Sequence, residues 1–345
     1  MDRKGNKMIK KLVFLTLFIS CISGLSAREF PLCLYGVTNP DDLKIIKKAG
    51  FSCIQTYNQD PQTMEKLAQR AQELGLKVVF YPNKILGTPY EQKAQKWPIL
   101  AWYLVDEPDV HHWSRARVEQ AHQATKQAFS NHDTALVIGQ GHTSIPYYDI
   151  TDVMMMDWYP VPHLPLTSFG DNVRYTKEGL IQAHKPDHPL WGVVQIFDWI
   201  NYRQYRPDND RIGRFPTTAE IRFMSYDGIL NGATGLFYYT FNHLKKPMPL
   251  SAPEYWGRVK TVLKELAQFK KIIEKGMPVS NSVLISQPLK MQTWQYKGHV
   301  YSVLLNASDL SVRVPDALLT KDYKPLYGTK KTEHITAYDV WLLKK

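Results

Sequence analysis

Two adjacent carboxylates, Asp106 and Glu107, are the residues of this chain whose type and position best suit acid–base chemistry. They end the apolar, aromatic-rich run 99–105, and Pro108 follows them directly. Because proline lacks an amide hydrogen and fixes its own backbone angle, the strand should end here with both carboxylates at its tip. A carboxyl group raised in pKa by burial can donate a proton to a leaving group. The pattern favours Glu107 as a general acid, although Asp-Glu-Pro is also ordinary turn chemistry.

Two further carboxylates follow apolar runs and are candidates for a partner of Glu107. Asp157 comes directly after 153–156, and Asp198 comes directly after 190–197. Either one would serve as a base, a nucleophile or a group that positions a substrate. Either one would equally well be an aspartate that initiates a turn.

Polar and aromatic side chains recur at the ends of the other apolar runs. Aromatic faces stack on sugar rings, and amides and carboxylates bind hydroxyl groups, so the composition suits a saccharide cleft. The candidate binding residues are Tyr57, Tyr81, Tyr159, Gln195, Trp199 and Tyr239. We expect neither a metal nor another cofactor, because the sequence has no Cys/His metal spacing, phosphate loop, dinucleotide fingerprint or serine elbow.

The elements that must position these residues alternate in the way that βα units do. Eight short apolar runs are predicted as strands, at 32–37, 52–57, 77–82, 99–105, 135–139, 152–157, 190–197 and 235–241. Amphipathic stretches of helical length separate them, at 40–49, 63–74, 112–129, 172–184, 217–231 and 254–274. This alternation predicts an α/β fold, a (β/α)8 TIM barrel. Such barrels carry their chemistry at the carboxyl ends of the strands, where the candidate residues stand.

The two ends of the chain differ from the barrel segment. Residues 1–27 combine a basic stretch with an apolar run and a small-residue cleavage site, as a signal peptide does, so we expect a secreted or periplasmic protein. A lipid anchor at Cys21 is the less favoured alternative, because Phe18 is a poor first residue for that motif. The barrel is expected over 28–276, and short alternating runs over 277–345 predict a small antiparallel β-sandwich domain.

The charge and the cysteines exclude some classes of function. The formal net charge is +11, but the basic residues are scattered in pairs such as Lys47-Lys48, whereas a nucleic-acid binder concentrates them on one face. No membrane span is expected once the signal is removed, and nothing indicates the oligomeric state. Cys33 and Cys53 lie in apolar strand-like runs, where a disulfide and two buried thiols are both compatible with the sequence.

These motifs resemble those of a known superfamily. The run 102–109 at the fourth strand, 152–160 at the sixth and 231–240 at the eighth are similar to those of TIM-barrel glycoside hydrolases related to the clan A retaining enzymes. The segment 192–195 and the tail, which resembles the small β-sandwich that often follows such barrels, add to the likeness. The resemblance implies that Glu107 is the acid/base residue.

The seventh strand departs from that family. Clan A enzymes usually carry a nucleophilic glutamate there, whereas this chain has Gln195-Ile-Phe-Asp-Trp199. The second carboxylate would therefore be Asp157 or Asp198. A strand-six aspartate with a strand-four glutamate also resembles the chitinase-like barrels, in which the aspartate supports a reacting N-acetyl group. Carboxyl separation distinguishes retention, at about 5–5.5 Å, from inversion, at about 6.5–9.5 Å.

The sequence therefore favours an exported glycoside hydrolase that acts on an oligo- or polysaccharide. Two alternatives come from other classes of protein: a non-catalytic carbohydrate-binding barrel, and an interaction protein of the cell envelope. Two or more carboxylates gathered at the barrel mouth would favour the enzyme. A single carboxylate among exposed aromatics would favour the binding protein, and a filled or flat mouth the interaction protein.

Overall fold

The computed structural model describes residues 29–143, 145–203, 213–280, 283 and 285–345. The expected signal peptide, residues 1–27, and the alternative lipid site at Cys21 lie outside the described residues. No helix in the described ranges is both long and apolar enough to span a membrane.

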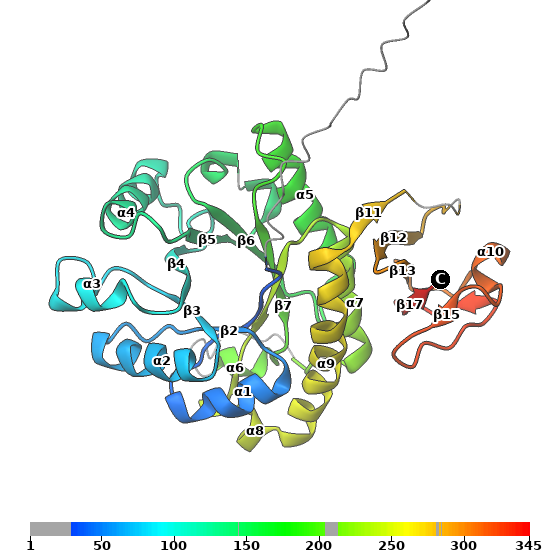
Figure 1. The fold of residues 1–345 in the computed structure, drawn as a ribbon, viewed down its shortest axis with the longest axis horizontal. Coiled ribbons are helices and arrows are strands. Elements are labelled where there is room, and N and C mark those ends of the chain that lie inside the picture. The colour runs from blue at the N-terminus through cyan, green and yellow to red at the C-terminus, as the bar shows by residue number, and fades with distance from the viewer. Residues whose placement is uncertain (1–28, 144, 204–212, 281–282, 284) are drawn as a thin grey trace, which may run out of the picture.

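Eight parallel strands close into a barrel in the order of the sequence, which confirms the predicted fold (Figure 1). The strands are β1 (Leu32–Leu34), β2 (Cys53–Gln55), β3 (Lys77–Phe80), β4 (Ile99–Asp106), β5 (Thr134–Ile138), β6 (Val153–Asp157), β7 (Leu190–Gln195) and β8 (Gly235–Tyr239). The ring closes where β1 pairs with β8, with Cys33 opposite Phe237.

Helices form the outer layer around the strands (Figure 1). The longer ones are α1 (Leu43–Ala49), α2 (Pro61–Glu73), α3 (Pro89–Ala94), α4 (Arg115–Ala128), α5 (Ser168–Gln182), α7 (Thr218–Leu230) and α9 (Pro253–Lys275). Local chemistry fixes their starts: Asp60 accepts a hydrogen bond from the Thr63 amide, and Thr217 and Glu220 form a capping box. Helix α3 was not predicted, and α5 begins four residues before its predicted start at 172.

Both faces of the strands are buried, which explains why the runs are apolar for most of their length. On β3, Val79 points into the barrel, while Val78 and Phe80 pack against the helices. Inside the barrel, Cys33 and Cys53 stand opposite each other on β1 and β2, with 4.4 Å between their Cα atoms, and are joined by a disulfide. The structure thus has the first of the two cysteine states that the sequence left open.

A small antiparallel domain follows the barrel. Its main sheet has the order β11 (Met277–Val279), β12 (Leu289–Tyr296), β13 (His299–Asn306), β17 (Val340–Lys344) and β15 (Lys324–Pro325). A second layer contains β14 (Val312–Arg313), α10 (Asp316–Leu319) and β16 (His334–Ile335). On β13, Val303 and Leu305 pack toward the barrel, whereas Leu304 packs with Ile335 in a separate core, as the predicted β-sandwich requires. In Figure 1 this domain lies beside α7 and α9.

Candidate active site

The end of β4 places two carboxylates at the mouth of the barrel. Asp106 is the last residue of the strand, and the Glu107 amide still donates to the Val137 carbonyl of β5 at 3.0 Å. Glu107 has a φ of 42°, a left-handed conformation that is uncommon for a residue with a side chain. The backbone therefore turns away from the sheet at Glu107, as the prediction of a strand end at this point required.

Asp157, the last residue of β6, meets Glu107 at the mouth. Its side chain is 8% exposed, and its Oδ2 accepts a hydrogen bond from the Tyr159 hydroxyl at 3.0 Å. Its Oδ1 has no hydrogen-bond donor among the described residues. The Glu107 and Asp157 carboxyls interact by charge and by a side-chain hydrogen bond, which requires a proton on one of them.

Burial and mutual repulsion keep protons on this cluster. Burial raises the pKa of Asp157 well above its usual value, and the charges of Glu107 and Asp106 raise it further. Burial and then the charge of Asp106 raise the pKa of Glu107, whereas its hydrogen bond with Asp157 lowers it. Burial also raises the pKa of Asp106, against a 2.6 Å hydrogen bond from Tyr103 that lowers it. Because like charges in contact do not both ionise, the Glu107–Asp157 pair keeps one proton in common at pH values where a free carboxyl has lost its own.

Asp198 stands apart from this pair. Its Oδ1 accepts from the Ile200 amide at 2.9 Å and thereby caps the short helix α6 (Ile200–Arg203). Its charge acts on His243, raising the pKa of that ring against the larger effect of burial. Of the two candidates for a second carboxylate, the structure brings only Asp157 to Glu107.

The predicted tyrosines gather at the mouth. The ring centroids of Tyr57 and Tyr81 are 6.3 Å apart, those of Tyr57 and Tyr239 are 6.4 Å apart, and Tyr159 stacks on Tyr239 at 5.5 Å. Trp199 adds its ring at 6.4 Å from Tyr159. Four strand ends and the residues after β7 thus supply one continuous aromatic lining.

Gln195 does not belong to that lining, which corrects its predicted role in binding sugar. Its side chain is fully buried, its Oε1 accepts from the Val161 amide at 2.8 Å, and its Nε2 donates to the Val161 carbonyl at 2.8 Å. The amide therefore clamps the loop after β6 to the end of β7. The Trp199 Nε1 donates to the same Val161 carbonyl at 2.8 Å, so its indole N–H is engaged by the backbone.

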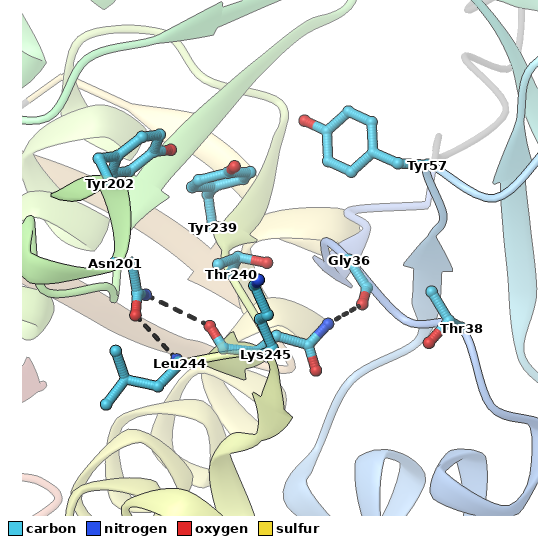
Figure 2. Close-up of a pocket in the computed structure, with 10 residues that line it drawn as sticks. Gly36, Thr38, Tyr57, Asn201, Tyr202, Tyr239, Thr240, Leu244 and Lys245 are labelled. Atoms are coloured by element: carbon cyan, nitrogen blue, oxygen red, sulfur yellow. Dashed lines mark hydrogen bonds between the residues drawn. The ribbon is translucent and has the colours of Figure 1, made fainter. Parts of the chain in front are cut away.

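A pocket of about 310 Å³ opens near the ends of β2 and β8 (Figure 2). It is lined by Gly36, Thr38, Tyr57, Asn201, Tyr202, Tyr239, Thr240, Asn242, Leu244 and Lys245. Burial and then the charge of Asp106 raise the pKa of Tyr57. Burial and the charges of Asp106, Asp157 and Glu107 raise the pKa of Tyr239 to about 12. These two tyrosines therefore border both the pocket and the carboxyl cluster. Across the described ranges, no cluster of three or more His, Cys, Asp or Glu side chains is suited to hold a metal ion.

The fold is that of TIM-barrel glycoside hydrolases. A GH30 endoxylanase from Clostridium papyrosolvens C71 matches with a TM-score of 0.55 and 12% identity, over 92% of this chain and 96% of that one. A family 39 glycoside hydrolase from Bacteroides cellulosilyticus WH2 matches with a TM-score of 0.57 and 12% identity, over 92% and 81%. Eubacterium rectale Amy13B matches with a TM-score of 0.58 and 9% identity, over 92% and 96%. No family model and no curated protein matches the chain.

Two residues of the cluster, Tyr35 and Tyr103, are not among the predicted site residues. Tyr103 donates to Asp106 and accepts from the Tyr35 hydroxyl at 3.4 Å. In a regular strand, residues three apart point to opposite faces. Between Tyr103 and Val105 the register with β5 shifts by one residue, and this bulge brings Tyr103 and Asp106 to the same face. The sequence of β4 carries no sign of the bulge.

Proposed function

We propose that this protein is a glycoside hydrolase in which Glu107 donates a proton to the leaving oxygen of a glycosidic bond. The observation that carries the proposal is the direct contact between the Glu107 and Asp157 carboxyls in an aromatic mouth. Glycoside hydrolysis needs a carboxylic acid with a raised pKa, and burial beside like charge raises the pKa of Glu107. The fold shared with an endoxylanase and an alpha-amylase supports the same conclusion.

The different solvent exposure of the Glu107 and Asp157 side chains assigns their roles. Glu107 is half-buried, so its outer oxygen can reach a substrate, whereas Asp157 is enclosed between Glu107 and Tyr159. In the proposed step the Glu107 proton moves to the glycosidic oxygen as the bond from that oxygen to the anomeric carbon breaks. Water then adds to the anomeric carbon and returns a proton to Glu107. When Glu107 gives up the proton that the pair shares, Asp157 is left ionised and stabilises the positive charge that develops on the sugar.

The contact between the two carboxyls argues against an inverting pair. Inverting enzymes hold their carboxyls about 6.5–9.5 Å apart, so that a water molecule fits between them. Carboxyls that share a proton leave no such space, and they also lie closer together than the about 5–5.5 Å of a retaining pair. Asp157 therefore acts as a supporting group, as in the chitinase-like barrels that the sequence resembles at strands four and six.

We also propose that the protein works outside the cytoplasm, in the periplasm or as a secreted enzyme. The expected signal peptide at 1–27 is the first reason. The Cys33–Cys53 disulfide is the second, because such bonds persist in oxidising compartments and are rare in the cytosol.

The decisive experiment compares the mature protein with its Glu107→Gln variant on a broad panel of oligo- and polysaccharides. Release of reducing ends by the wild type should fall at least ~100-fold in the variant, the scale of losing a positioned general acid. Glu73→Gln, on the exposed face of α2 in an ion pair with Arg70, is the matched control and should keep full activity. Unchanged hydrolysis by Glu107→Gln would rule out the assignment.

A second candidate is a barrel that binds carbohydrate without cleaving it. It is favoured by one observation: Gln195 occupies the seventh-strand end, where related enzymes carry a nucleophile, and is fully engaged by the Val161 backbone. Saccharide binding by the mature protein with no release of reducing ends across the panel would favour this candidate.

A further inference from the structure

A glycine, Gly139, lies between the two carboxyls of the Glu107–Asp157 pair. Strands β4 and β6 are not neighbours in the barrel, because β5 runs between them. Ile138, the last residue of β5, pairs with Met156, so Gly139 is level with Asp157. The Glu107 carboxyl must therefore pass over the end of β5 to meet Asp157.

The alternation of β5 directs position 139 into the barrel. Ala135 and Val137 both point inward, and Gly139 continues that series. A Cβ on Gly139 would lie 3.1 Å from the Glu107 Oε1, so the carboxyl would have to move by a few tenths of an ångström. The φ of Gly139 lies outside the left-handed region, so its backbone conformation does not require glycine. What requires glycine here is the space that the Glu107 side chain occupies.

Asp109 holds the end of β5 in place under this carboxyl. Its Oδ1 accepts a hydrogen bond from the Gly139 amide at 3.1 Å. Its Oδ2 accepts from the Gln140 amide at 3.0 Å and from the Thr143 hydroxyl at 2.6 Å. These three bonds oppose a retreat of the backbone from an added side chain, so the Glu107 carboxyl would have to move instead.

A second contact at Gly139 has to be separated from this one. The same Cβ would lie 2.7 Å from Val110 Cγ2. Val110 is 44% exposed on the loop after β4, so its side chain can turn toward solvent. Shortening Val110 to alanine removes this contact and leaves the one with Glu107, which makes the two effects separable.

We propose that Gly139 is a positioning residue: the absence of a side chain at the end of β5 lets the Glu107 carboxyl cross the strand and share a proton with Asp157. The inference rests on the proposed function, because the shared proton is the one that Glu107 donates to the substrate. It adds a residue of β5 to the two strand ends that carry the carboxyls.

Contact between two carboxyls separates their two ionisation steps. The first step leaves an anion that accepts the remaining proton, and the second step must overcome like-charge repulsion. Accordingly, the hydrogen bond within the pair lowers the pKa of Glu107, and the charge of Glu107 raises the pKa of Asp157. The active form holds one proton on the pair, so the two steps bound its pH range. The other titratable groups that act on Glu107 or feel its charge include Asp106, Asp109, His111, Tyr202 and Tyr239.

The test compares Gly139→Ala/Val110→Ala with Val110→Ala in the mature protein. The two apparent pKa values of the pair should lie closer together in the double variant. NMR titration of isotope-labelled carboxyl carbons measures them, and Glu107→Gln and Asp157→Asn identify the two resonances. On the substrate found with the panel, kcat should fall by about tenfold, the scale of misplacing a reacting group by part of an ångström. The pH range of activity should narrow from both sides.

Gly192→Ala on β7 is the matched control. Its Cβ would lie at the same distance, 3.1 Å, from an atom of another side chain, but that atom is the Phe169 Cζ. This variant should unfold at a lower urea concentration without changing either pKa of the pair or the pH range of activity. Equal pKa values of the pair in Gly139→Ala/Val110→Ala and Val110→Ala would overturn the inference. So would a narrowing in Gly192→Ala as large as that in the double variant.

The two proposals fail separately, because the NMR titration does not depend on activity. Closer pKa values of the pair in the double variant, without glycoside hydrolysis by the wild type, would overturn the proposed enzyme and leave the spacing role of Gly139 standing. Hydrolysis that depends on Glu107, with the pKa values and kcat unaffected by the change at Gly139, would overturn the positioning role alone.

Discussion

The ends of β6 and β7 are neighbours at the mouth of one barrel. Asp157 ends β6 and Asp198 follows β7, yet the two aspartates have different roles. At the end of β6, Asp157 keeps one carboxylate oxygen without a hydrogen-bond donor among the described residues and contacts Glu107. At the end of β7 and just after it, the backbone engages both polar side chains. Asp198 accepts a hydrogen bond from the Ile200 amide, and Gln195 both accepts from and donates to the Val161 backbone. A polar side chain at a strand end is available for chemistry only where its polar atoms are not already hydrogen-bonded to the nearby backbone.

The largest expected difference between the two regions is in catalysis. Asp157→Asn should lower kcat by about 100-fold or more, because an amide cannot share the proton of the pair. Asp198→Asn should change kcat by less than a few-fold, since asparagine caps a helix about as well as aspartate. Steady-state kinetics on the substrate identified by the panel measures both. A comparable loss of kcat in the two variants would show that Asp157 and Asp198 contribute equally to catalysis.

The second difference is in stability, at Gln195. Gln195→Glu restores the residue type that clan A enzymes carry at the seventh strand, and we expect no gain in activity from it. A glutamate oxygen would replace the Nε2 donor and face the carbonyls of Val161 and Phe197, so buried acceptors would oppose one another, and Val161 would keep only its bond from Trp199. The free energy of unfolding should fall by about 1–3 kcal/mol in urea denaturation. Higher kcat with unchanged stability would show that β7 is a second reactive end.

The third prediction concerns pH and Asp106. Glu107 must be protonated to act as the acid, so activity should fall as the pH rises through the pKa of Glu107. The negative charge of Asp106 raises that pKa. Asp106→Asn removes the charge and lowers the pKa, so the alkaline limb of the kcat/KM profile should move to lower pH. A limb that stays in place or moves to higher pH would contradict the electrostatic role of Asp106.

The barrel was predictable because each strand is buried on both faces and therefore stands out as an apolar run between helical segments. The proximity of Glu107 and Asp157 was also predictable, because the carboxyl ends of parallel strands lie at the same end of the barrel. Helix α5 begins before its predicted start and includes Gly170. A Cβ there would clash with Asp227 Oδ2, so the glycine permits α5 to pack closely against α7.

Other features depend on contacts that no local pattern encodes. The clamp formed by Gln195 requires the loop after β6, which lies 34 residues away in the sequence. The bulge in β4 is visible only against its partner strand β5, and it decides which side chains face the carboxyl cluster. The two-residue period of a regular strand would place Tyr103 on the face opposite to Asp106.

The smallest expected effect tests that bulge. The Tyr103 hydroxyl donates to Asp106 at 2.6 Å and lowers the pKa of that carboxyl. In Tyr103→Phe the pKa of Asp106 rises, so this carboxyl carries less charge at a given pH and repels the Glu107 carboxylate less. The alkaline limb of kcat/KM should therefore move to lower pH, in the same direction as in Asp106→Asn but by less. Adding Tyr103→Phe to Asp106→Asn should produce no further shift, since the charge through which Tyr103 acts is already gone. Additive shifts in the double variant would show that Tyr103 acts on Glu107 by another route.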